Sequence, residues 1–188
     1  PLNVGMTDVH GIPNKWMRAF GAMNGTPNLD WFIEELAKAE KDAAEILDID
    51  LYTYFEDKIS SIPIGSNGII YHPYISPGGE RAPFVKPTAK AQFMGINLDN
   101  DKYDLLRAVY EGVAMSMLDC YKHMPGNIKE IHLSGGGASS EFWCQMFSDA
   151  IGRVIKIPRG SEFGAKGAVI NAAVAIEYFD SYEEAINN

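Results

Sequence analysis

The chain has 188 residues, of which 46% are hydrophobic and 22% charged, the composition of an ordinary globular domain. It carries 16 basic and 25 acidic residues, a net charge of −9, so long-range attraction to nucleic acid or to an anionic membrane is excluded. Its length and apolar content also exclude a mainly disordered chain and a small scaffold that needs disulfide staples, and they favour a single domain.

The N-terminus, the cysteines and the apolar runs bear on the compartment. Pro1, with no initiator methionine, indicates a cut or partial polypeptide, and no signal-peptide pattern follows it. The longest apolar stretch, 167–176, is too short to span a bilayer. Cys120 and Cys144 are interpreted as free buried thiols, with a disulfide as the alternative. The four histidines share no ligand-like spacing with each other or with the cysteines, so we expect no metal site. Because the sequence shows neither a signal-peptide pattern nor a membrane-spanning stretch, we expect a cytoplasmic protein.

The first half of the chain is mainly helical by its apolar periodicity. In chain order we expect a strand over 2–9, a helix over 12–23 and a long helix over 28–47 that Asn28 or Asp30 caps. A short helix over 51–59 and a buried strand over 69–72 follow. Residues 73–90 then carry four prolines and Gly78-Gly79, too broken for regular structure but too apolar for a linker. Such a segment is usually functional or interfacial. Within it, Glu80 and Arg81 form either a solvated turn or, as the apolar flanks favour, a buried ion pair.

The second half alternates between strands and helices. The expected strands are 92–96, 128–133 and 153–157, and the expected helices are 101–123, 139–151 and 162–179. This alternation predicts an α/β fold with helices packed on a sheet. Gly152 is expected to end the middle helix as a C-terminal glycine cap.

Ser134-Gly135-Gly136-Gly137, called the glycine turn below, stands between an expected strand and an expected helix. Glycines permit positive φ and a close approach of a ligand to the backbone. The helix that follows offers unpaired N–H groups at its N-terminus. The turn is therefore a plausible nucleotide contact, although a merely tight turn has the same pattern. No Ser-His-Asp, Cys-His or paired-carboxylate arrangement is recognisable in the chain.

Five segments, in one order along the chain, resemble the C-terminal domain of the FGGY carbohydrate kinases, a family that includes glycerol kinase and xylulokinase. Residues 91–96 followed by 104–111 fit the C-terminal signature of that family at every position. The other four segments are Gly11–Trp16, Gly79–Pro83, Ser134–Trp143 and Glu162–Ala168. The sequence SGGGASSEFW is most similar to xylulokinase-like members.

The resemblance implies an actin-like (ribonuclease H-like) ATPase fold with extra helices, in which 1–188 forms the C-terminal half of a two-domain kinase and lacks the first strands of that domain. It implies ATP and Mg²⁺, and a sugar or polyol, with a xylulose-like ketose favoured, bound mainly by a missing N-terminal domain. The catalytic aspartate would lie upstream, so no catalytic residue is expected in this chain. A homodimer is a candidate assembly, because an exposed sheet edge would remain.

Residue by residue, the resemblance carries the adenosine contacts onto Gly136 and Ser140, within the turn that Gly135 and Gly137 complete. Two further ATP-site positions fall on Gly11 and Lys15. Lys15 stands where glycerol kinase has Gln, and Ser140 where it has Asn. The rival interpretations are a non-catalytic actin-like nucleotide-binding or regulatory module and an interaction domain that binds no nucleotide.

Overall fold

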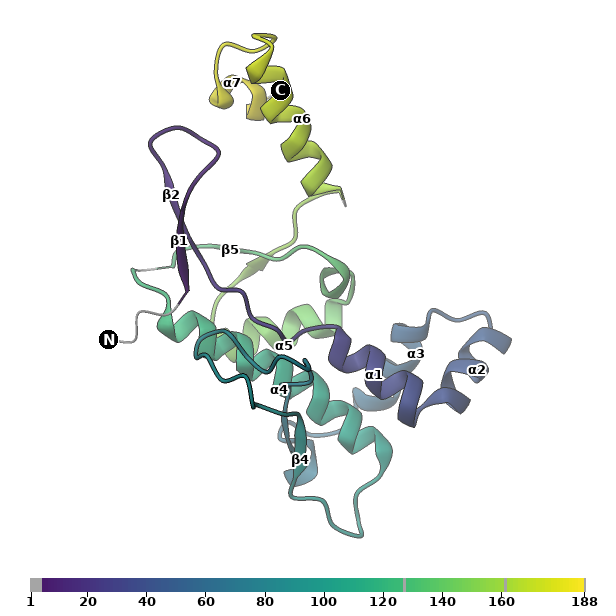
Figure 1. Cartoon of the computed structure of the whole chain (residues 1–188). Coiled ribbons are helices and arrows are strands. Elements are labelled where there is room, and N and C mark those ends of the chain that lie inside the picture. The colour runs from purple at the N-terminus through teal and green to yellow at the C-terminus, as the bar shows by residue number, and fades with distance from the viewer. Residues whose placement is uncertain (1–4, 127, 161, 188) are drawn as a thin grey trace. The chain divides into compact units, whose positions relative to one another are not determined.

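The computed structural model describes residues 5–126, 128–160 and 162–187, which divide into two compact units. The larger unit comprises residues 20–157, and the smaller unit comprises residues 6–19 and 158–187. Figure 1 follows the elements by residue number. None of the helices in the described ranges is long and apolar enough to cross a membrane. Cys120 and Cys144 are both buried and free, as expected.

Three helices open the larger unit: α1 (Pro27–Leu36), α2 (Lys38–Ile46) and α3 (Leu51–Ile59). The expectation of one long helix over 28–47 is wrong, because the backbone leaves the helical region at Ala37, with φ −135° and ψ 32°. Ala37 is itself buried, so tertiary packing outweighs its high helix propensity at this position. The expected helix 51–59 is confirmed, and the side chain of Asp50 caps it by accepting from the Thr53 N–H.

The core of the larger unit forms around α4 (Lys102–His123), where the sequence predicts a helix from Asp101. Asp101 and Asp104 form a capping box, in which each side chain accepts from the backbone N–H of the other. Half of the residues of α4 are buried, and they pack against α1, α3, α5 and the strand β3 (Ile70–His72). β3 pairs antiparallel with β4 (Gln92–Met94), a shorter strand than predicted.

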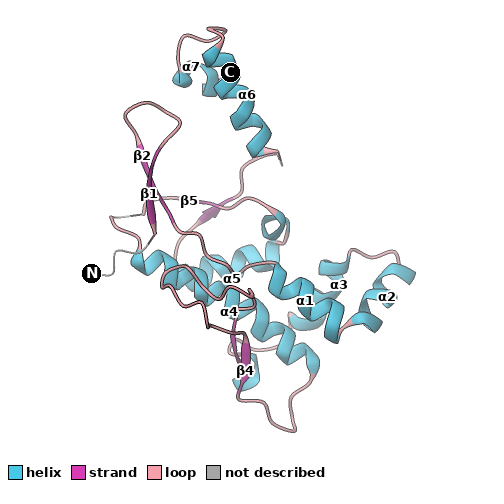
Figure 2. Cartoon of the chain, in the orientation of Figure 1, coloured by secondary structure: helices cyan, strands magenta, loops and turns pink. Residues whose placement is uncertain are grey.

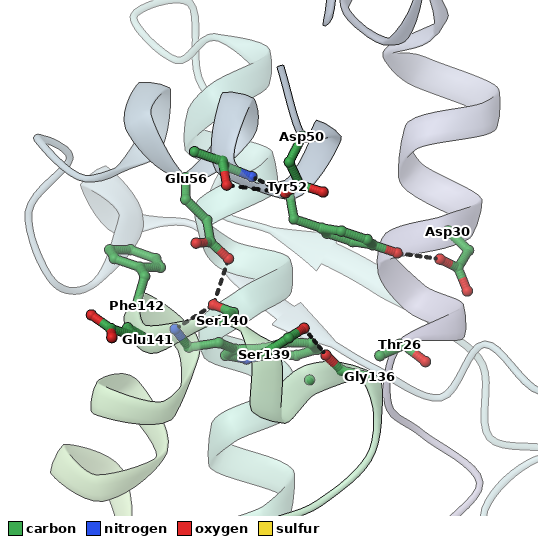
Figure 3. Close-up of a pocket in the computed structure, with 13 residues that line it drawn as sticks. Thr26, Asp30, Asp50, Tyr52, Glu56, Gly136, Ser139, Ser140, Glu141 and Phe142 are labelled. Carbon is green, nitrogen blue, oxygen red and sulfur yellow. Dashed lines mark hydrogen bonds between the residues drawn. The ribbon is translucent and has the colours of Figure 1, made fainter. Parts of the chain in front are cut away.

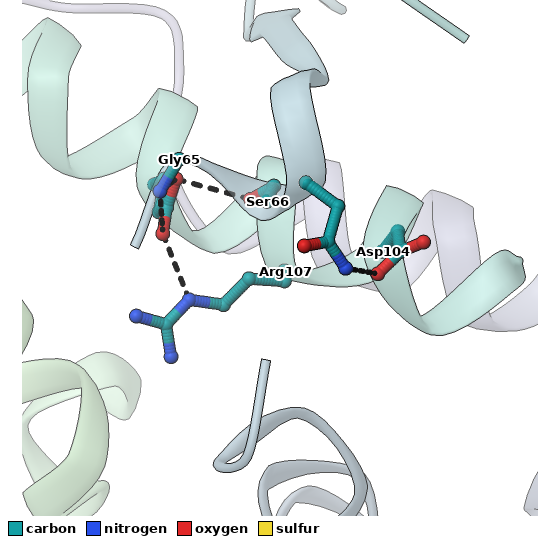
Figure 4. Close-up of polar contacts among 6 residues, drawn as sticks. Gly65, Ser66, Asp104 and Arg107 are labelled. Atoms are coloured by element: carbon teal, nitrogen blue, oxygen red, sulfur yellow. Dashed lines mark hydrogen bonds and ion pairs between the residues drawn. The ribbon is translucent and has the colours of Figure 1, made fainter. Parts of the chain in front are cut away.

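The polar residues of α4 bind the short helical turn η1 (Ser66–Gly68), as Figure 4 shows. The Glu111 carboxylate accepts from the Gly65 N–H at 3.1 Å, from the Ser66 hydroxyl at 3.0 Å and from Arg107 Nε at 2.8 Å. Two turns before Glu111, Asp104 accepts from Asn67 Nδ2. These bonds fix the chain immediately before β3.

The irregular segment 73–90 has no helix or strand, as predicted, but the expected Glu80–Arg81 ion pair is not formed. Arg81 is exposed, whereas Glu80 is 1% exposed. The Glu80 carboxylate accepts from the backbone N–H groups of Met23, Arg81 and Ala82 and from Asn24 Nδ2, all within 3.1 Å. Four donors satisfy the buried charge without a cation, because several N–H groups can stabilise a carboxylate together.

The α/β part of the larger unit runs through four elements (Figure 2). These are β5 (Ile131–His132), η2 (Gly136–Ser139), α5 (Glu141–Ile151) and β6 (Ile155–Lys156). β5 and β6 pair in parallel on either side of the α5 crossover, which confirms the predicted strand–helix–strand order. Both strands are shorter than predicted. Gly152 ends α5 in the left-handed conformation, as expected.

The smaller unit contains β1 (Met6–Val9), β2 (Trp16–Ala19), α6 (Phe163–Ala175) and α7 (Tyr182–Asn187). The helix expected over 12–23 is wrong, because β2 pairs antiparallel with β1 to form a hairpin. Asn14, in the connecting turn, has φ 61° and cannot continue a right-handed helix. The strand expected over 2–9 is confirmed from Met6 onward, since residues 2–4 lie outside the described residues. The last long helix ends four residues earlier than predicted, and α7 was not predicted.

Replacement of Gly112 tests the contact of α4 with β3. A Cβ atom at this position would lie 2.4 Å from the Tyr71 carbonyl oxygen. We expect Gly112→Ala to lower the free energy of unfolding by about 1–3 kcal/mol through overpacking, measured by urea denaturation. Gly167→Ala in α6, where a Cβ meets nothing within 4 Å, should leave stability unchanged or raise it. Equal stability of Gly112→Ala and the wild type would contradict the close contact.

Candidate functional site

A cavity of about 720 Å³ in the larger unit lies beside the glycine turn, and we call it the glycine-turn cavity. Three parts of the chain form its walls: the start of α1, the first half of α3, and the η2–α5 junction. Figure 3 shows their side chains converging on one space. The volume falls within the range of small-molecule binding sites, roughly 300–1,000 Å³.

The glycine turn forms one wall of this cavity with backbone atoms alone. Gly135 has φ 95° and ψ −174°, a conformation that in practice only glycine adopts, and it turns the chain from β5 into η2. Gly136 and Gly137 line the cavity. A Cβ atom at Gly136 would meet nothing within 4 Å, so the missing side chain leaves open space at the wall.

Ser140 connects the glycine turn with α3. Its hydroxyl accepts from the Trp143 N–H at 2.8 Å, which makes it the N-cap of α5. The same hydroxyl donates to Glu56 Oε1 at 2.5 Å, and the Tyr110 hydroxyl donates to that oxygen at 3.4 Å. Burial raises the pKa of Glu56, and these two hydrogen bonds only partly offset it.

Tyr52 extends from α3 across the cavity toward α1 (Figure 3). Its hydroxyl donates to Asp30 Oδ1 at 3.1 Å, and the residue is 37% exposed. Burial, with the Asp30 carboxylate next in effect, raises the pKa of Tyr52. The phenol therefore stays neutral and presents a ring surface to the cavity opposite the glycine turn.

The electrostatic character of the cavity is acidic. No lysine or arginine occurs among the described residues that line it, whereas four carboxylates do: Asp30, Asp50, Glu56 and Glu141. A group with many hydrogen-bond donors and no negative charge fits such a lining, because carboxylates accept hydrogen bonds and repel anions.

Four of the six sequence-derived candidates belong to the larger unit, and two belong to the smaller unit. Gly136, Gly137 and Ser140 line the glycine-turn cavity, and Gly135 shapes the turn. Gly11 and Lys15 belong to the β1–β2 hairpin of the smaller unit, which is described by itself. Their predicted role remains untested.

Sequence reasoning missed the contributions of α1 and α3. The residues concerned are Thr26, Asp30, Asp50, Tyr52, Thr53 and Glu56. The available signal was weak: Tyr52 and Glu56 are four residues apart in an expected helix and so share a face. Nothing local shows that this face meets a serine 84 residues further along the chain.

Solved structures define the fold class. A xylulose kinase from Lactobacillus acidophilus matches this chain with a TM-score of 0.70 at 24% sequence identity, over 87% of this chain and 32% of that one. The chain therefore has the mixed helix and strand fold of the C-terminal domain of actin-like ATPases, as the sequence predicted.

The family follows from the sequence itself. The model of the FGGY family of carbohydrate kinases, C-terminal domain, matches residues 4–176, and the chain belongs to this family. Over 95% of this chain, the sequence is 31% identical to a gluconokinase of Bacillus subtilis. Over 87% of this chain, it is 33% identical to an erythritol kinase of Brucella abortus. The chain spans about a third of the length of these curated relatives, 34% and 31% respectively.

The raised pKa of Glu56 makes stability depend on pH. The native state binds a proton at the Glu56 carboxyl more tightly than the unfolded chain does. The contribution of Glu56 to the free energy of unfolding is therefore fully present below pH 4.5, the ordinary pKa, and falls as the pH rises through the higher pKa of the native state. We expect Glu56→Gln to gain stability relative to the wild type across that interval, measured by urea denaturation at a series of pH values. Ser140→Ala should extend this pH interval to higher pH, because the substitution removes a hydrogen bond that lowers the pKa of Glu56 in the native state. A constant difference between Glu56→Gln and the wild type would contradict the assignment.

Proposed function

We propose that this chain forms the nucleotide-binding part of an ATP-dependent carbohydrate kinase, and that the glycine-turn cavity receives the adenosine moiety. The observation that supports this most is the meeting of Gly136 and Ser140, the two adenosine positions implied by the family resemblance, at the wall of a single cavity. Backbone atoms and hydroxyl groups at that wall suit a flat, neutral nucleoside.

The acidic lining supports an orientation for the nucleotide. Phosphates beside four carboxylates would be repelled, so we propose that the triphosphate extends out of the cavity, away from α3. Mg²⁺ would accompany the phosphates and neutralise their charge. The described residues include no group of three or more His, Cys, Asp or Glu side chains that could hold a metal ion, so we assign no metal ligand within them.

The reaction we propose for the intact protein is transfer of the γ-phosphoryl group to a hydroxyl of a small sugar, sugar acid or polyol. The relatives are named for gluconate, erythritol and xylulose, and a xylulose-like ketose remains our favoured acceptor. The catalytic aspartate that deprotonates the hydroxyl would lie in an N-terminal domain outside this chain.

The proposal also includes the predictions from the sequence on the domain, the other ATP-site residues, the compartment and the assembly. We propose that 1–188 forms one C-terminal kinase domain without its first strands, that Gly11 and Lys15 contribute to the ATP site, and that the enzyme acts in the cytoplasm, where a homodimer is its candidate assembly.

Isothermal titration of Mg-ADP into the 188-residue chain tests the site. We expect measurable binding by the wild type and loss of at least tenfold in affinity for Gly136→Val, because a Cβ at Gly136 meets nothing within 4 Å and the valine methyl groups would occupy space at the cavity wall. Gly21→Val is the matched control, since its Cβ also meets nothing within 4 Å and Gly21 does not line the cavity. No binding by the wild type, or equal affinity of Gly136→Val and the wild type, would contradict the proposal.

A coupled ADP-release assay with a panel of sugars and polyols tests the location of the catalytic residue. The chain alone should give no turnover, because no residue in it is proposed to deprotonate the acceptor hydroxyl. A rate above background from a sample whose mass is verified would show that the catalytic group lies within this chain.

A further inference from the structure

Glu56 reaches the glycine-turn cavity from α3, outside the segments that the family resemblance singles out. It lies one helical turn after Tyr52, so both side chains face the same space (Figure 3). Tyr52 is fixed at its far end by Asp30, and Glu56 is fixed by Ser140. The cavity therefore has an aromatic surface and a carboxylate in defined positions.

Among the described residues, one of the two Glu56 carboxylate oxygens accepts hydrogen bonds and the other does not. Oε1 accepts from Ser140 and Tyr110, whereas no donor to Oε2 is found among the described residues. An ionised carboxylate can accept about four hydrogen bonds, so acceptor capacity remains at the cavity. The nearby Asp50 carboxylate raises the pKa of Glu56 further, and no lysine or arginine occurs in the described lining. A ligand group at Glu56 must therefore be a hydrogen-bond donor without negative charge.

We propose that Glu56 determines nucleoside specificity in this site: its carboxylate accepts a hydrogen bond from a neutral N–H or O–H donor of the nucleoside, while the base packs on the Tyr52 ring. The donor is either the exocyclic amino group of adenine or a ribose hydroxyl, which share this chemistry. This inference rests on the proposed nucleotide-binding function.

The proposal changes the role of Ser140. Its single hydroxyl proton is directed to Glu56 and it accepts from Trp143, so it acts on the ligand through Glu56. Ser140 is then a positioning residue, and Glu56 is the residue that contacts the nucleoside.

The test is isothermal titration of Mg-ADP into the wild-type chain, Glu56→Ala and Glu56→Gln. We expect Glu56→Ala to weaken binding about tenfold or more, the usual effect of losing a hydrogen bond to a charged group. Glu56→Gln should recover part of the affinity, because its amide oxygen still accepts. Asp57→Ala is the control, since Asp57 is exposed on the same helix and does not line the cavity. Circular dichroism melting verifies that each variant is folded.

Three analogues identify the donor: purine riboside diphosphate, which lacks the amino group, 2′-deoxy-ADP and 3′-deoxy-ADP. The analogue without the donor should bind the wild type and Glu56→Ala equally. The inference is overturned if folded Glu56→Ala binds Mg-ADP like the wild type, if Asp57→Ala is weakened as much, or if Glu56→Ala weakens all three analogues as it weakens Mg-ADP. In each of these cases, binding of Mg-ADP by the wild type still supports the proposed nucleotide-binding function. If the wild type does not bind Mg-ADP, both the proposed function and the inference about Glu56 are overturned.

Discussion

Burial of α4 is the constraint on which the larger unit depends. This helix gives its apolar residues to α1, α3 and α5, so the three elements that wall the glycine-turn cavity share one support. β3 approaches α4 so closely at Gly112 that no side chain fits between them. The Tyr71 hydroxyl of β3 then donates to Asn28 of α1 at 2.8 Å, in a fully buried contact. The elements that form the cavity walls are therefore packed on one core, which keeps their relative positions fixed.

The irregular segment 73–90 contributes to the same support through one carboxylate. Glu80 binds the backbone at Met23 and the side chain of Asn24, shortly before Thr26 enters the cavity wall. A segment without regular structure thereby fixes the entry into α1. The four donors also make the burial of this carboxylate tolerable, because an unpaired polar group at the same place would be costly.

Local signals predicted the elements whose ends are determined by local chemistry. The predicted start of α4 at Asp101 and the predicted end of α5 at Gly152 match the observed limits, and the expected range 51–59 matches α3, which Asp50 caps in the structure. The break at Ala37 depends on packing in the core, and the β1–β2 hairpin depends on a turn with a positive φ at Asn14, so apolar periodicity alone gave the wrong answer for both. The site divides in the same way: the glycine turn is visible in the sequence, whereas Tyr52 and Glu56 join it only through packing on α4.

The acidic lining of the cavity has a consequence for ionic strength. Carboxylates near a bound nucleotide oppose each added phosphate, and salt screens such forces over roughly 10 Å at 0.1 M. Affinity for a nucleoside should then vary little with salt, while affinity for its di- and triphosphate rises as salt or Mg²⁺ is added. Under the proposed function, a cavity with this charge would favour the metal complex of the nucleotide over the free anion.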